Sequence, residues 1–201
     1  MKFFFFIICC LLLFITPVFG AEIFFGVQNQ KIGFDKLFEV GVFINTENEP
    51  VNTIAGKINF SSELLELKEI REGNSIVNFW IEKPEVKEEG VVFSGITPGG
   101  YIGQNGYLFS LIFKTKKIGE TIITSAEEQI FLNDGQGSKA SIKQAPLSLQ
   151  IEENVPGGEF SLPSDSEKPE PFEPIVAQDL KIFEGKYFLV FATQDKRSGI
   201  D

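Results

Sequence analysis

One stretch decides the fold: Asn105-Gly106-Tyr107-Leu108-Phe109-Ser110-Leu111-Ile112-Phe113-Lys114-Thr115. It opens with an Asn-Gly turn signal and continues as a strand, whose side chains alternate between two faces. One face carries only apolar or aromatic side chains, namely Tyr107, Phe109, Leu111 and Phe113. The other face is mixed, with Leu108, Ser110, Ile112 and Lys114. This pattern predicts a central strand of a two-layer sandwich, with the mixed face toward a partner or solvent.

Further strands are indicated on both sides of this stretch, and two of them, Lys36 to Thr46 and Val51 to Phe60, show clear alternation. The further strands are Glu22 to Gln28, Lys36 to Thr46, Val51 to Phe60, Ser75 to Pro84, Gly90 to Thr97, Thr121 to Ser125, Gln129 to Leu132 and Ala145 to Ile151. Pro98-Gly99-Gly100 predicts a flexible loop, and Ser61-Ser62-Glu63 predicts at most a single helical turn. About nine short strands without a longer helix predict an all-β sandwich.

Residues 1–20 have the pattern of a signal peptide. A single cation, Lys2, precedes an apolar run from Phe3 to Ile15, which is shorter than the roughly 20 residues of a membrane-spanning helix. We expect cleavage before Ala21; the alternative is an uncleaved N-terminal anchor. Both cysteines, Cys9 and Cys10, lie inside this segment, and the bulky residues before them argue against a lipoprotein signal.

The composition narrows the possible functions. The chain contains no histidine, and the expected mature chain contains no cysteine, so disulfides, thiol catalysis and imidazole ligands are excluded. An exported protein without cysteine is typical of bacteria. The formal net charge of −10 disfavours nucleic acid and anionic lipid surfaces as partners. If residues 1–20 are cleaved off, membrane attachment would need an anchor outside this sequence.

The C-terminal part differs from the predicted sandwich, which spans residues 21–152. Residues 153–174 are rich in proline and glutamate and poor in branched apolar residues, which predicts an extended linker. Tyr187 to Thr193 is again a strong strand, followed by Asp195-Lys196-Arg197-Ser198-Gly199-Ile200-Asp201. This tail resembles the opening strands of bacterial immunoglobulin-like repeats. We therefore expect residues 175–201 to begin a second, truncated β module of a longer protein.

The order of features up to Ile151 resembles that of a cohesin domain. The features are Val40 to Thr46, Lys57-Ile58-Asn59-Phe60, Ser61-Ser62-Glu63-Leu64-Leu65-Glu66-Leu67, the Glu72-Gly73 turn, Gly90-Val91-Val92-Phe93-Ser94-Gly95, Gln104 to Lys114 and the Asn133-Asp134-Gly135 turn. This resemblance implies a nine-stranded jelly-roll β-sandwich, related to carbohydrate-binding modules and exported to the cell surface or beyond.

Cohesins bind dockerins, which are small calcium-loaded modules, through one flat sheet face. Many type I cohesins present Asn and Asp to the dockerin on the strand that corresponds to Val51 to Phe60. This chain has Thr53, Ala55 and Lys57 there. It also has Phe60-Ser61-Ser62 where cohesins often carry an aromatic residue followed by Asp-Pro.

Neither catalysis nor a metal site is predicted. Without His or Cys the common nucleophile-base arrangements are impossible, and no spacing of acids indicates a converging carboxylate pair. The loop Asn133 to Gly137 lacks the repeating acids and the final Glu of an EF-hand, so we interpret it as a plain turn. We predict no cofactor.

Four aromatic residues are candidates for ligand binding. Phe79, Trp80, Tyr101 and Tyr107 lie near loops or on the central strand, where a flat ring could stack on a sugar. Core packing is the alternative for each of them. The sequence thus predicts a non-catalytic extracellular interaction module of cohesin type, with a dockerin-like partner. Direct binding of a polysaccharide and a structural role in a stalk or adhesin are the two alternatives.

Overall fold

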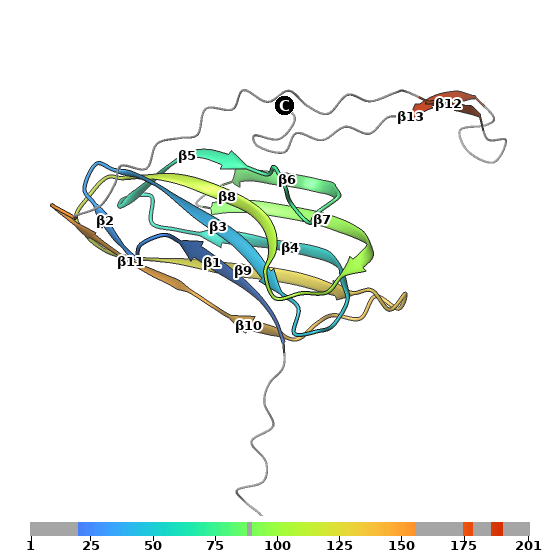
Figure 1. Cartoon of the computed structure of the whole chain (residues 1–201), viewed down its shortest axis with the longest axis horizontal. Coiled ribbons are helices and arrows are strands. Elements are labelled where there is room, and N and C mark those ends of the chain that lie inside the picture. Colours follow the sequence, from blue (N-terminus) through green and yellow to red (C-terminus); the bar gives the residue numbers. More distant parts are fainter. Residues whose placement is uncertain (1–19, 88–89, 156–174, 179–185, 191–201) are drawn as a thin grey trace, which may run out of the picture.

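The fold is a β-sandwich of two facing sheets (Figure 1). A computed structural model describes residues 20–87, 90–155, 175–178 and 186–190. In order, the first sheet contains β10 (Ile142–Gln144), β1 (Ala21–Val27), β3 (Leu37–Asn45), β8 (Gly106–Thr115) and β5 (Leu65–Arg71). The second contains β2 (Lys31–Gly33), β11 (Leu147–Glu152), β9 (Gly119–Leu132), β4 (Val51–Asn59), β7 (Gly90–Tyr101) and β6 (Phe79–Lys87).

The structure confirms the predicted all-β class. The described residues contain no helix, and hence none long and apolar enough to cross a membrane. Strands β1 and β10, and β2 and β11, pair in parallel, whereas the other pairs within the two sheets are antiparallel. The two short strands β2 and β10 carry too few residues for an alternating pattern, and the sequence did not predict them.

The core lies between the sheets and forms as the alternation predicts. On β3, which pairs with β8, Phe38, Val40, Val42 and Ile44 are buried and point toward the second sheet. Phe109 on β8 is fully buried and makes edge-to-face contacts with Phe93 and Trp80, with ring centroids 5.0 and 6.3 Å apart. Each such side chain stabilises the fold by about 1.5 to 3 kcal/mol on burial.

The predicted faces of β8 are wrong at its start. The register pairs Phe109 with Val42 but Tyr107 with Phe43, so Leu108 is the extra residue of a β-bulge. Because of this bulge Leu108 enters the core, and Tyr107 turns to the outer face beside Phe43. The mixed face is also less open than predicted, since Ser110 and Ile112 are buried on it.

Two local predictions also need correction, and a third is confirmed. Pro98-Gly99-Gly100 is the end of β7 rather than a loop, and Gly99 and Gly100 have φ values of 88° and 81° that suit glycine. The two predicted strands Thr121 to Ser125 and Gln129 to Leu132 are one strand, β9, interrupted by a bulge where Glu127 has a φ of 53°. Ser61 accepts backbone hydrogen bonds from Leu64 and Leu65, which makes a turn there, as predicted.

Several predictions lie largely outside the described residues. These are the signal peptide, of which only Gly20 is described, most of the linker 153–174 and most of the second module. Within that module, β12 (Ile175–Gln178) pairs antiparallel with β13 (Tyr187–Val190). Strand β13 coincides with the start of the strand predicted from Tyr187 to Thr193.

Candidate functional site

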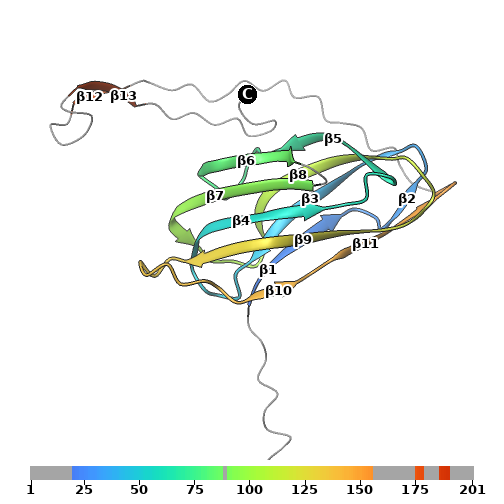
Figure 2. The same cartoon turned by 180° about the vertical axis from the view of Figure 1, so that it is seen from behind.

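The candidate site lies on the outer face of the six-stranded sheet, which is turned toward the viewer in Figure 2. Its middle strand, β4, turns Thr53, Ala55 and Lys57 outward, while Ile54 and Ile58 point into the core. The register places outward residues of two neighbouring strands beside them: Ile96, Ser94 and Val92 on β7, and Phe131, Gln129 and Ala126 on β9. We call these nine residues, with Phe79 on β6, the docking face.

One end of the docking face is apolar. The register aligns Phe79, Ile96, Thr53 and Phe131 in a row across four strands. Phe79 is 62% exposed, which is high for a phenylalanine on a sheet. At the other end of the row the Lys139 ammonium lies 5.5 Å from the centroid of the Phe131 ring, in a cation–π contact. An exposed apolar row bordered by polar groups is typical of a protein-binding surface.

Charges beside the docking face partly neutralise one another. On β6, Lys87 contacts Glu82 and also lies with its ammonium 2.7 Å from the Glu85 carboxylate. These hydrogen bonds raise the pKa of Lys87, so this cation is retained at any physiological pH. The pairs are exposed and contribute little to stability.

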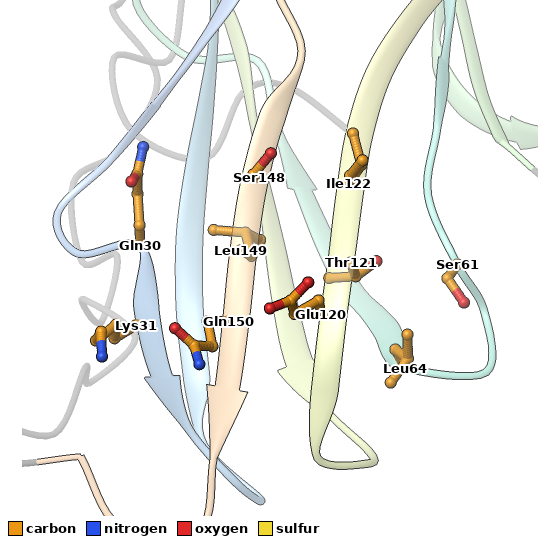
Figure 3. Close-up of a pocket in the computed structure, with 10 residues that line it drawn as sticks. All are labelled: Gln30, Lys31, Ser61, Leu64, Glu120, Thr121, Ile122, Ser148, Leu149 and Gln150. Atoms are coloured by element: carbon orange, nitrogen blue, oxygen red, sulfur yellow. The ribbon is translucent and has the colours of Figure 1, made fainter.

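A groove of about 720 Å³ lies at the far end of the same sheet (Figure 3). The side chains of Lys31, Gln150 and Glu120 form a row across β2, β11 and β9, and Ser148 and Ile122 form the next. Ile122 is 55% exposed there. The groove is lined by amides, hydroxyls, one ammonium, one carboxylate and three aliphatic side chains, so it can form hydrogen bonds but lacks the pair of acids that glycoside hydrolysis needs.

The four predicted ligand-binding residues do not come together. Phe79 lies on the docking face, but its neighbour Trp80 points inward, is half-buried and packs against Phe109. Tyr101 is half-buried against the core, and its ring occupies the space beside Gly103 and Gly106. Tyr107 lies on the outer face of the other sheet. The four rings therefore do not form a single stacking platform.

Several acidic residues at the surface are engaged in ion pairs. Glu66 lies 2.6 Å from Lys68, and Glu72 lies 2.7 Å from Lys83. The Lys68 ammonium lowers the pKa of Glu66. In the described part of the chain, no group of three His, Cys, Asp or Glu residues could hold a metal ion.

Sequence reasoning missed two outward-facing aromatic residues, Phe24 and Phe43. Their rings stack with centroids 5.4 Å apart on the outer face of the five-stranded sheet. Phe43 shares a face of its strand with Glu39, Gly41 and Asn45. The presence of an aromatic residue in that polar set was the signal that could have revealed this surface.

No protein-family model and no curated protein matches the sequence, so similarity is found in the fold alone. A cohesin module of a family 33 glycoside hydrolase from Clostridium perfringens has a TM-score of 0.56 and 17% identity over 68% of this chain and 100% of its own. A non-cellulosomal cohesin of the archaeon Archaeoglobus fulgidus has a TM-score of 0.54 and 17% identity over 66% and 91%. A cohesin–dockerin complex of Clostridium thermocellum has a TM-score of 0.51 and 19% identity over 66% and 99%. The sandwich from Ala21 to Glu152 therefore has the fold of a cohesin module.

Proposed function

We propose that the protein is a non-catalytic interaction module of cohesin type, which binds a dockerin-like partner on its docking face. The cohesin fold supports a protein-interaction role, since several neighbours of this fold were solved with a dockerin bound. The observation that carries the proposal is the open outer face of the six-stranded sheet. It presents Thr53, Ala55 and Lys57 on the strand where the resemblance places dockerin contacts, beside the exposed Phe79.

The partner that fits this face differs from a dockerin that contacts Asn and Asp side chains on the corresponding strand of a type I cohesin. Along β4 the face offers a hydroxyl, a methyl group and an ammonium, and its apolar row offers two phenylalanines and an isoleucine. We expect an apolar anchor of the partner to contact Phe79 and Ile96. Aromatic residues that become buried on binding are among those that contribute most of the binding energy.

We also propose that this module works outside the cell as part of a longer chain. The apolar segment 1–20 supports export, and the proline-rich residues 153–174 support a spacer between the sandwich and a second β module at 175–201. A spacer of this kind would hold the docking face away from neighbouring modules. The acidic net charge of −10 is compatible with a calcium-loaded partner.

Titration calorimetry with a broad panel of calcium-loaded dockerin modules tests the docking proposal. We expect at least one module to bind, and Phe79→Ala to weaken it by tenfold or more, which corresponds to about 1.4 kcal/mol. Phe34→Ala is the matched control because Phe34 is also an exposed phenylalanine, but it follows β2 at the opposite edge of the sheet. Its affinity should stay within about twofold of wild type. Absence of binding across the panel, or equal losses in both variants, would overturn the proposal.

A further inference from the structure

Three aromatic residues form a row on the outer face of the five-stranded sheet, opposite the docking face. Phe24 on β1, Phe43 on β3 and Tyr107 on β8 are partners in the strand register. The Phe24 and Phe43 rings are nearly parallel, with an interplanar angle of 21° and centroids 5.4 Å apart. Tyr107 meets Phe43 edge-on at 5.5 Å and 63°, so it closes the row at one end. We call these three residues the aromatic row.

Two glycines allow the Phe43 ring to lie on the sheet. A Cβ atom at Gly41 would stand 2.5 Å from Cε2 of Phe43, and one at Gly26 would stand 2.9 Å from the same atom. The ring therefore occupies space that any other residue would fill at these paired positions. One side of the ring covers the glycine backbone, and all three rings remain half-buried rather than buried. An aromatic face close to the sheet and partly open to solvent can accept a flat ligand.

Polar groups border the row at the Tyr107 end. The Arg71 guanidinium binds Glu69 through two hydrogen bonds, with Nε 2.6 Å from Oε1 and Nη2 3.2 Å from Oε2. Glu69 raises the pKa of Arg71, which fixes its charge. The Tyr107 hydroxyl donates to the Arg71 carbonyl oxygen at 3.3 Å, and burial raises the pKa of this hydroxyl. A guanidinium paired with a carboxylate offers both donors and acceptors within a small area.

Most charges around the row are paired within the chain, and Glu39, on the same face of β3 as Phe43, adds one carboxylate near Arg71 and Tyr107. Arg71 is paired with Glu69 at one end, and Lys143 lies 3.3 Å from Glu22 at the other. A polyanion or a strongly basic partner would find little net charge to complement here. A stable protein interface buries about 800 Å² on each partner, and three half-buried rings offer much less. The surface thus suits a narrow, uncharged ligand.

We propose that the aromatic row binds a neutral polysaccharide chain. The C–H groups of a sugar ring carry a weak positive charge and pack against the negatively charged face of an aromatic ring. The positive edge of one aromatic ring packs against the face of another in the same way. Phe24 and Phe43 form the stacking surface, Tyr107 limits it, and Arg71 with Glu69 binds sugar hydroxyls. This binding is separate from the proposed docking, because it uses the opposite sheet.

Native gel electrophoresis in gels containing soluble polysaccharide tests this proposal. The probes are neutral xylan, neutral mixed-linkage glucan and anionic polygalacturonate. We expect at least one neutral polymer to retard the protein, with an apparent affinity that falls at least tenfold in Phe43→Ala and in Phe24→Ala. Gly41→Ala should weaken binding as well, since the added Cβ displaces the ring while all aromatic groups remain. Phe79→Ala, on the docking face, is the control and should bind like wild type.

Three outcomes would contradict the proposal that the aromatic row binds a neutral polysaccharide. Lack of retardation by both neutral polymers in wild type would show that the row only covers its two glycines, a structural role known for aromatic side chains on sheets. Equal retardation of wild type and Phe43→Ala would place the sugar elsewhere, and retardation by polygalacturonate alone would contradict a neutral ligand. Urea unfolding of each variant shows whether it is folded. If Phe43→Ala does not fold, Phe24→Ala and Gly41→Ala still test the proposal. Dockerin affinity should be unchanged in Phe24→Ala, Phe43→Ala and Gly41→Ala, so failure here is distinct from failure of docking.

Discussion

Replacement of Phe109 by alanine tests the packing of the two sheets. Phe109 is fully buried on β8 and contacts the rings of Phe93 and Trp80 from the other sheet. Phenylalanine to alanine in a core costs about 3 to 5 kcal/mol, and this range includes the loss of ring pairs, which are worth about 0.5 to 1.5 kcal/mol each. We expect a total near the upper end, about 4 to 5 kcal/mol, because two pairs are lost at one site. Phe79→Ala should cost less than about 0.5 kcal/mol, since Phe79 is 62% exposed.

Urea denaturation followed by tryptophan fluorescence measures this difference directly. Trp80 is the single tryptophan of the chain and contacts Phe109, so its emission reports on the packing itself. With a slope of about 2 kcal/mol/M, Phe109→Ala should lower the midpoint by roughly 2 M and Phe79→Ala by less than about 0.3 M. If Phe109→Ala does not fold, Phe109→Leu should still cost about 1 to 2 kcal/mol. A loss below about 1 kcal/mol in Phe109→Ala, or equal losses in the two alanine variants, would refute this account of the core.

Three further predictions concern single residues. Leu108→Ala should cost about 2 to 5 kcal/mol in urea unfolding because the bulge places Leu108 in the core; a cost below about 0.5 kcal/mol would mean regular alternation instead. Burial raises the pKa of the Tyr107 hydroxyl, so the stability that its protonated form contributes is complete below about pH 10 and is lost as the pH rises through the raised pKa. The difference in ultraviolet titration between wild type and Tyr107→Phe should have its midpoint above about pH 10. A midpoint at or below about pH 10 would contradict burial of this hydroxyl. The Lys114 ammonium, 2.7 Å from the Asp35 carboxylate, lowers the pKa of Asp35, so the stability that this ion pair contributes is present above about pH 4 and is lost as the pH falls. Titration of the Asp35 carboxyl group followed by NMR should have its midpoint below about pH 3.9. A midpoint at the ordinary value of an aspartate would mean that the ion pair does not persist in solution.

The alternation of apolar and polar residues predicted most of the sandwich, because successive side chains of a strand point to opposite faces of the sheet and only one face is buried. The set Phe38, Val40, Val42 and Ile44 is buried as the pattern required. The alternation is interrupted at a β-bulge, because one extra residue moves the side chains that precede it to the opposite face. For this reason Leu108 and Tyr107 were assigned to the wrong faces of β8. A bulge depends on the partner strand, and the sequence of one strand does not contain that information.

The candidate surfaces were less predictable than the core. Trp80 and Phe79 are adjacent, and only the pairing of Trp80 with Gly95 fixes which of them faces solvent. The aromatic row joins residues that are far apart in sequence, from Phe24 through Phe43 to Tyr107. Phe43 also depends on the glycines at positions 26 and 41, which only the strand register brings together. Long-range register was therefore the missing information in both cases.

The most direct test of the central claim is NMR mapping of a bound dockerin module on the isotopically labelled protein. The proposed docking predicts the largest shift changes at Thr53, Ala55 and Ile96 on the six-stranded sheet, with Phe24 and Phe43 on the opposite sheet unchanged. The largest changes at Phe24 and Phe43, or no change with any calcium-loaded dockerin, would contradict the claim that the outer face of the six-stranded sheet binds the partner.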